Sequence, residues 1–166
     1  MKRADLISQK IFSPEQIVQN VAQWRVQAKT IAFTNGVFDI LHPGHIFSLS
    51  QAAKEAEYLI VGLNSDSSVK RLKGESRPVN NQDSRALILA SLVIVDAVVI
   101  FEDDTPLALI KAILPDVLVK GGDYTVEQIA GAKEVIANGG RVVINPILNG
   151  FSSTNIINHT KKGDLQ

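Results

Sequence analysis

The stretch TIAFTNGVFDILHPGH, residues 30–45, decides the fold. Its first part, residues 30–34, is rich in apolar and β-branched residues on successive positions, which is typical of a strand buried on both faces of a parallel sheet. A polar loop follows, and a Pro-Gly pair then marks the start of a helix that we expect over about 45–56. A strand that ends in a polar loop and continues into a helix is the repeating unit of α/β domains.

The same unit recurs along the chain. Further strands are expected at 58–63, 97–101, 117–119 and 141–144, and further helices at 82–92, 106–113 and 132–137. This order predicts a doubly wound, Rossmann-like α/β fold with a mostly parallel five-stranded sheet and helices on both faces. Before it, the pattern SPEQ at 13–16 predicts a capped helix. We therefore expect an N-terminal helical extension over 1–28 and one α/β domain over 29–166.

The bulk composition excludes several classes of function. The 166 residues include 17 basic and 17 acidic side chains, so no large electric field favours nucleic acid or an anionic membrane. The chain has no cysteine, which excludes disulfides, thiolate metal sites and cysteine nucleophiles. No apolar run approaches the ~20 residues that span a bilayer. We expect a cytoplasmic protein that binds neither nucleic acid nor membrane.

Four loops follow the predicted strands, at 35–45, 64–66, 120–123 and 149–154. In doubly wound sheets, ligands bind beyond the carboxyl ends of the strands. These loops hold most of the side chains with unusual chemistry. We therefore expect them to form one anion-binding site.

The first of these loops holds two histidines, His42 and His45, at the start of a predicted helix. A helix N-terminus carries unpaired N–H groups and partial positive charge, and imidazoles there can donate hydrogen bonds to phosphate oxygens. Gly36 permits a sharp turn after the strand, and Gly44 permits close approach of a ligand. The alternatives are a capped helix with two solvent-exposed histidines, or a metal site, for which the two histidines and Asp39 are a poor ligand set.

Loop 35–45 resembles the signature of the HxGH nucleotidyltransferase superfamily. A closer resemblance is to the D-glycero-β-D-manno-heptose 1-phosphate adenylyltransferase family. It is carried by NSD at 64–66, KRLKG at 70–74, RPVN at 77–80, DDTP at 103–106, residues 114–124, IAG at 129–131 and SSTNII at 152–157. The resemblance implies a nucleotidyltransferase domain over 29–166 that transfers AMP from ATP to the heptose 1-phosphate by direct in-line attack. The products would be pyrophosphate and ADP-heptose, a lipopolysaccharide precursor.

The resemblance also implies roles for individual residues. The implied catalytic residues are His42, His45 and Lys73, with Lys70 as the alternative to Lys73. The implied nucleotide contacts are Asn35, Gly36, Val37, Phe38, Gly44, Lys120, Gly121, Ser152, Ser153 and Thr154. The implied sugar-phosphate contacts are Asp39, Asn64, Asp66, Lys70, Arg85 and Asp123. Other interpretations stay open, because the lysines also fit a solvated helical face, Arg85 a surface salt bridge, and the hydroxyls at 152–154 a helix cap.

The implied reaction brings partners with it. ATP would carry Mg²⁺, held mainly by its phosphate oxygens, because the sequence has no evident carboxylate cage. The family is often fused to a sugar kinase that residues 1–28 are too short to supply, so we expect a separate kinase. The apolar face of the first helix suggests a homodimer. The alternatives are a cytidylyltransferase acting on glycerol 3-phosphate or another alcohol or sugar phosphate, and a nucleotide-binding module without turnover.

Overall fold

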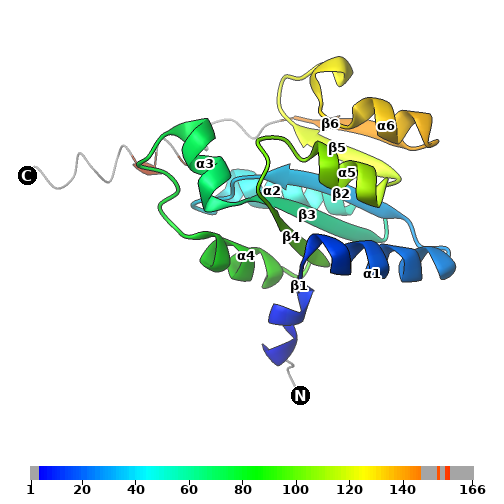
Figure 1. Ribbon diagram of the computed structural model, residues 1–166, viewed down its shortest axis with the longest axis horizontal. Coiled ribbons are helices and arrows are strands. Elements are labelled where there is room, and N and C mark those ends of the chain that lie inside the picture. Colours follow the sequence, from blue (N-terminus) through cyan, green and yellow to red (C-terminus); the bar gives the residue numbers. More distant parts are fainter. Residues whose placement is uncertain (1–3, 147–152, 154–155, 158–166) are drawn as a thin grey trace, which may run out of the picture.

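Six strands form one parallel sheet (Figure 1). The structure, a computed structural model, describes residues 4–146, 153 and 156–157. The strands are β1 (Ile11–Phe12), β2 (Ile31–Gly36), β3 (Tyr58–Asn64), β4 (Ala97–Phe101), β5 (Val117–Gly121) and β6 (Arg141–Asn145). They lie in the order β1-β4-β3-β2-β5-β6, and every neighbouring pair is parallel. The chain thus winds outward in both directions from β2, as the doubly wound prediction requires.

The predicted fold class is confirmed, but the predicted strand number is wrong. The structure has six strands where the sequence analysis expects five. The additional strand, β1, has two residues and lies parallel to β4, with Ile11 opposite Val98 and Phe12 opposite Val99. A strand this short makes no periodic apolar run, so the sequence pattern carries no signal for it. The predicted boundary at residue 28 stays a prediction, although β1 and the following helix pack on the same sheet as the rest.

The helices are α1 (Pro14–Val26), α2 (Pro43–Ala53), α3 (Asp66–Lys73), α4 (Gln82–Ala90), α5 (Leu107–Ile113) and α6 (Ala132–Ala137). Three short 3-10 turns accompany them: η1 (Ala4–Leu6), η2 (Ser8–Lys10) and η3 (Val126–Gln128). Helix α3 does not appear among the helices expected from the sequence. It begins because Ser65 accepts a hydrogen bond from the backbone N–H of Ser68, which caps the first turn.

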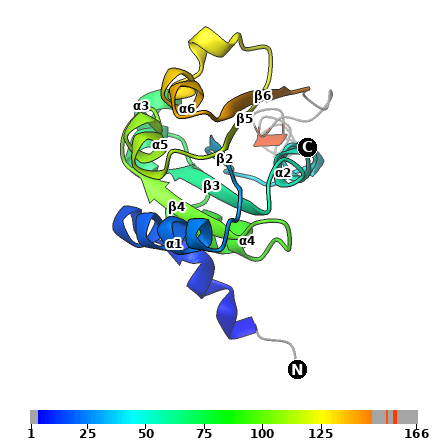
Figure 2. The ribbon, with the colours of Figure 1, turned by 90° about the vertical axis from the view of Figure 1, so that its right-hand side faces the viewer.

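Helices cover both faces of the sheet (Figure 2). Helices α1, α5 and α6 pack with one hydrophobic core, and α2 and α4 pack with another. Successive strand residues alternate between the two: Phe33 and Leu118 belong to the α1/α5 side, whereas Val117 and Val119 belong to the α2/α4 side. This alternation decides on which face each strand-end side chain lies.

The apolar face of helix α1 packs against the chain's own sheet. Ser13 and Gln16 form a capping box at its start, and Ile17 and Val21 are buried against the sheet. Trp24 stacks on Tyr58, the first residue of β3, with ring centroids 4.2 Å apart and an interplanar angle of 5°. The face that suggested a homodimer is therefore covered by the chain's own sheet. In the part of the chain that the structure describes, no helix is long and apolar enough to cross a membrane.

Candidate active site

The loop after β2 is shaped by Gly36 and Phe38. Phe38 has a φ of +47°, and its ring folds back so closely that a Cβ on Gly36 would lie 2.9 Å from it. Gly36 is therefore required by packing. Phe38 is buried, and its ring lies 5.3 Å from the ring of His45, tilted by 58°. The Phe38 ring, just beyond the end of the central strand β2, thus packs beside the His45 ring.

His42 and His45 stack on one another at the start of α2. Their ring centroids lie 3.8 Å apart with an interplanar angle of 20°. His42 is the N-cap residue of this 11-residue helix and Pro43 is its first residue, but the His42 side chain makes no capping hydrogen bond. Both rings are partly buried, unlike two solvent-exposed histidines. The imidazoles and the positive end of α2 therefore lie together, which is an arrangement suited to phosphate oxygens.

Burial changes the protonation of both histidines. Burial lowers the pKa of His42 below its ordinary value. Burial and the neighbouring His42 ring lower the pKa of His45 to about 4, with the Ile40 backbone carbonyl acting in the opposite direction. Both rings are therefore neutral at neutral pH in the unliganded protein, and each has one N–H to donate. An approaching polyphosphate would raise both pKa values by its negative charge.

Asp39 holds the segment that precedes α4 in place by hydrogen bonds. Its side chain is fully buried and its carboxylate accepts a hydrogen bond from Arg77 Nε at 2.7 Å. It also accepts from the backbone N–H groups of Val79 and Asn80 at 2.9 Å. Burial acts to raise the pKa of Asp39, but these hydrogen bonds outweigh it and leave the pKa below its ordinary value. Asp39 thus orders a loop, and its contact with a sugar phosphate stays a prediction.

Arg85 joins the segments around the site. Its side chain is fully buried, so the alternative of a surface salt bridge is wrong. The guanidinium donates hydrogen bonds to the carbonyls of Asn80, Val37 and Asn64 and to the carboxylate of Asp66, at 2.7–2.9 Å. These partners come from the loop after β2, the end of β3, the start of α3 and the segment before α4. Direct contact of Arg85 with a sugar phosphate stays a prediction.

Three further residues that the sequence assigns to the sugar phosphate lie at or just after strand ends: Asn64, Asp66 and Asp123. Asn64 is buried, and its side-chain amide donates to Ser68 Oγ at 3.0 Å. Asp66 is one-third exposed, and its backbone N–H donates to Gln82 Oε1 at 2.9 Å. Asp123 is exposed in the segment after β5. All three residues lie at the same edge of the sheet, but the side-chain amide of Asn64 is already hydrogen-bonded within the protein.

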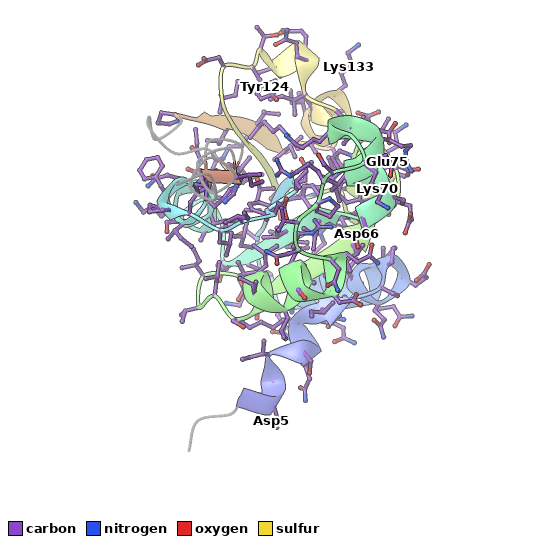
Figure 3. The ribbon with its side chains drawn as sticks, turned by 90° about the vertical axis from the view of Figure 1, so that its left-hand side faces the viewer. Asp5, Asp66, Lys70, Glu75, Tyr124 and Lys133 are labelled. Carbon is purple, nitrogen blue, oxygen red and sulfur yellow. The ribbon has the colours of Figure 1, made fainter. Side chains whose placement is uncertain are left out.

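The basic last turn of α3 holds both candidate lysines, of which Lys70 is labelled beside Glu75 in Figure 3. Lys70 Nζ lies 3.8 Å from the Glu75 carboxylate, and the Arg71 guanidinium pairs with Asp104 at 2.8 Å. Lys73 is exposed, and among the residues that the structure describes it makes no ion pair. This difference favours Lys73 as the lysine available to an incoming anion.

Lys120 and Gly121 end strand β5 and lie on opposite faces of the sheet. Lys120 Nζ lies 3.4 Å from Asn35 Oδ1 and 5.5 Å from the centre of the Tyr124 ring. Gly121 lies against α2, where a Cβ would be 3.2 Å from Ser48 Oγ. Burial lowers the pKa of Lys120. The two residues were predicted as joint nucleotide contacts, but only Gly121 lies on the side of the histidines.

The last predicted loop is described only at Ser153. Its hydroxyl donates to the backbone carbonyl of Ile40 at 3.2 Å, which brings residue 153 against the histidine loop. Ser152 and Thr154 lie outside the described residues. Within the described part, no group of three or more acidic or histidine side chains could hold a metal ion.

The sequence analysis missed part of this framework. It did not anticipate the pairing of Arg77 with Asp39, or Tyr124 beside Lys120. It also placed Arg85 among ligand contacts, although Arg85 shares its helical face with the buried Leu89, four residues later. That spacing is the signal that would have indicated burial.

Comparison with known protein families agrees with this geometry. Residues 33–159 match the cytidylyltransferase-like family. The bifunctional protein HldE of Rhodopseudomonas palustris strain BisB5 is 53% identical over 153 residues, which are 92% of this chain and 31% of that protein. The bifunctional protein HldE of Nitrobacter winogradskyi is 57% identical over 139 residues, covering 84% of this chain and 28% of that protein. The chain thus spans less than a third of the length of these curated relatives.

Two solved structures share the fold. The lipopolysaccharide core biosynthesis protein from Thermoplasma volcanium GSS1 has a TM-score of 0.58 and 27% identity, covering 72% of this chain and 97% of that one. The pantoate-beta-alanine ligase from Francisella tularensis, in complex with beta-gamma ATP and beta-alanine, has a TM-score of 0.58. That ligase is 17% identical, with 93% of this chain and 78% of that one covered, and it supports the fold alone.

Proposed function

The chain belongs to the cytidylyltransferase-like family, and on that premise we propose that it transfers AMP from ATP to D-glycero-β-D-manno-heptose 1-phosphate. The observation that carries this proposal is the stacked pair of His42 and His45 at the positive end of α2. The choice of substrates is supported by the motifs outside this loop and by the similarity to HldE proteins over 84–92% of the chain.

The reaction needs charge stabilisation more than proton transfer. A phosphate oxygen of the sugar phosphate is already ionised at neutral pH, so its attack on the α-phosphorus requires no general base. A new P–O bond forms there while the bond to the β-phosphate oxygen breaks, and pyrophosphate leaves with its electron pair. Along this path negative charge accumulates on the leaving pyrophosphate, and hydrogen-bond donors placed in advance lower the energy of the transition state.

The proposed catalytic residues would supply those donors. His42 and His45 would donate N–H groups to phosphate oxygens, aided by the backbone N–H groups of the first turn of α2. Lys73, at the end of α3 and without an ion pair in the described structure, would reach the triphosphate as a mobile positive charge. Arg85 and Asp39 would keep the loops that carry these groups in register.

The proposed metal ion is the one that accompanies the nucleotide. Enzymes of this kind that use ATP generally need a divalent cation, and we propose Mg²⁺, which would neutralise part of the triphosphate charge when bound. The described residues offer no cluster of protein ligands for it. The homodimer and the separate sugar kinase expected from the sequence stay predictions.

A pyrophosphate-release assay tests the proposed function. The purified chain is given ATP, CTP, GTP or UTP, each with the heptose 1-phosphate, mannose 1-phosphate or glycerol 3-phosphate. We expect release only with ATP and the heptose 1-phosphate, and its loss in His45→Ala. Release with CTP and glycerol 3-phosphate would instead identify a cytidylyltransferase. Binding of ATP without release with any acceptor would identify a module without turnover.

A further inference from the structure

The edge of the sheet where β2 and β5 end carries a recess on the face covered by α5. This cavity has a volume of about 170 Å³ and lies between the segments that follow β4 and β5. Its polar lining residues are Asn35, Asp104, Thr105, Lys120, Tyr124 and Gln128. Figure 3 faces this edge and shows Tyr124 on the segment that follows β5, apart from Lys70 on α3.

Among the residues that the structure describes, no carboxylate pairs with Lys120 in this cavity. Its described contacts are neutral: the Asn35 amide oxygen at 3.4 Å and the ring of Tyr124 at 5.5 Å. The one carboxylate in the lining, that of Asp104, is already paired with Arg71 at 2.8 Å. A partly buried ammonium group is costly unless a negative charge accompanies it, and burial accordingly lowers the pKa of Lys120. The cavity therefore favours an anion.

The alternation of the strands separates this cavity from the histidines. On β5, Leu118 belongs to the core on the α1/α5 side, and Lys120 lies two residues later on the same face. Asn35 is related to Phe33 of β2 in the same way. Helix α2, which begins with the histidine pair, covers the opposite face and lies against Gly121. An anion at Lys120 and a triphosphate at α2 thus approach the edge of the sheet from two sides.

We propose that the Lys120 cavity binds the phosphate monoester group of the acceptor, with Asn35, Thr105 and Gln128 offering polar contacts to it and to neighbouring hydroxyls. Lys120 is then a sugar-phosphate contact, where the sequence analysis expected a nucleotide contact. This inference rests on the proposed function, because it assigns the second substrate of the same reaction. It places the attacking oxygen at the end of β2 and β5, facing a nucleotide held at α2.

Calorimetric titration of the full chain tests this assignment. The probes are the heptose 1-phosphate, glycerol 3-phosphate and an ATP analogue whose α,β-bridging oxygen is replaced by methylene. The variants are Lys120→Met, which keeps the stem without the charge, and Lys120→Arg, which keeps the charge. Lys133→Met is the control, because Lys133 is exposed at the start of α6 and does not line the cavity.

We expect Lys120→Met to weaken binding of the heptose 1-phosphate about tenfold or more, the usual consequence of losing a charge-assisted hydrogen bond. Binding of the ATP analogue should change less than twofold, Lys120→Arg should retain most of the acceptor affinity, and Lys133→Met should change neither. Equal weakening of both ligands, or of the ATP analogue alone, overturns the proposal. So does a wild-type chain that binds none of the sugar phosphates.

A second variant covers the case in which Lys120→Met does not fold. Gln128→Glu keeps the side-chain oxygen that accepts from the Thr125 N–H, and it adds a negative charge to the cavity lining. We expect it to weaken the acceptor several-fold and to spare the ATP analogue; unchanged acceptor binding overturns the proposal. If both ligands bind as expected but no pyrophosphate forms, the proposed function fails and the cavity assignment stands. If glycerol 3-phosphate binds in place of the heptose, the cavity assignment stands and the proposed acceptor is wrong.

Discussion

Two groups of polar side chains border the same edge of the sheet, and they differ in where their polar atoms are directed. The framework group, Asp39 and Arg85, directs its hydrogen bonds inward to other parts of the chain. The histidine group, His42 and His45, consists of two neutral rings stacked at a helix start and supported by Phe38. The framework group holds loops in place, whereas the histidine group is proposed to offer donors to a ligand. A charged side chain near a site is therefore not by itself a ligand contact.

The largest effect we expect is on stability, from the framework. Arg85→Met removes the partner of the Asp66 carboxylate and of three backbone carbonyls. We expect the free energy of unfolding, measured in urea, to fall by about 3–5 kcal/mol, as for other broken buried ion pairs. Arg71→Met is the control, because its ion pair with Asp104 is exposed and should contribute about 0–1 kcal/mol. Unchanged stability with lost acceptor binding would move Arg85 into the ligand-contacting group.

The next effect we expect is on kcat, from a substitution in the histidine group. His45→Ala removes one donor at the start of α2, and we expect kcat to fall by about 10²–10³, the usual loss for a donor that stabilises developing charge. The thermal midpoint should change far less than in Arg85→Met. Lys54→Ala, an exposed change just beyond the end of α2, should leave kcat unaltered. A loss of stability without a loss of kcat would show that the histidines belong to the framework.

Comparing the two lysines of α3 sharpens the same distinction. Lys73 makes no ion pair within the described residues, whereas Lys70 lies 3.8 Å from Glu75. We expect Lys73→Ala to raise the KM for ATP by about tenfold, the lower end of what a charged hydrogen bond contributes. Lys70→Ala should change it less than threefold. Initial rates over a range of ATP concentrations give both values, and the reverse order would assign the triphosphate contact to Lys70.

The last effect, small near neutral pH, is the response of stability to pH. The pKa of His45 is about 4 in the folded protein, against 6.5 for an unperturbed histidine. Between these two values the unfolded chain binds the proton more readily, so this histidine destabilises the fold as the pH decreases from 6.5 to 4. His45→Gln should lose less stability than wild type over this range, as followed by thermal melting. Saturating ATP should reduce the difference, because its phosphates favour the protonated ring.

Much of the fold follows from the sequence because its strands are long enough to show a pattern. The runs at β2 to β6 and the capping residues Ser13 and Pro14 of α1 are local signals. Strand β1 escapes prediction because two residues carry no period. Helix α3 escapes because it has eight residues and only one buried apolar side chain, Val69.

The site was predictable in location but not in detail. Strand ends and glycines mark the loops, and His42 and His45 at the start of a predicted helix mark the first loop as an anion-binding candidate. The hydrogen bonds of Arg85 join residues up to 48 positions apart, and no local pattern encodes such pairings. The face on which Lys120 lies was available from strand alternation: counting two residues back reaches the buried Leu118.

The stacked Trp24 and Tyr58 have a practical consequence. Trp24 is the one tryptophan of the chain, and it contacts the first residue of β3, at the end of the strand remote from the ligand loops. A seven-residue strand separates it from that edge by roughly 20 Å. Tryptophan fluorescence will therefore report the docking of α1 and global unfolding while staying silent to substrates. Denaturation experiments on any active-site variant can be read with this intrinsic probe, without a label.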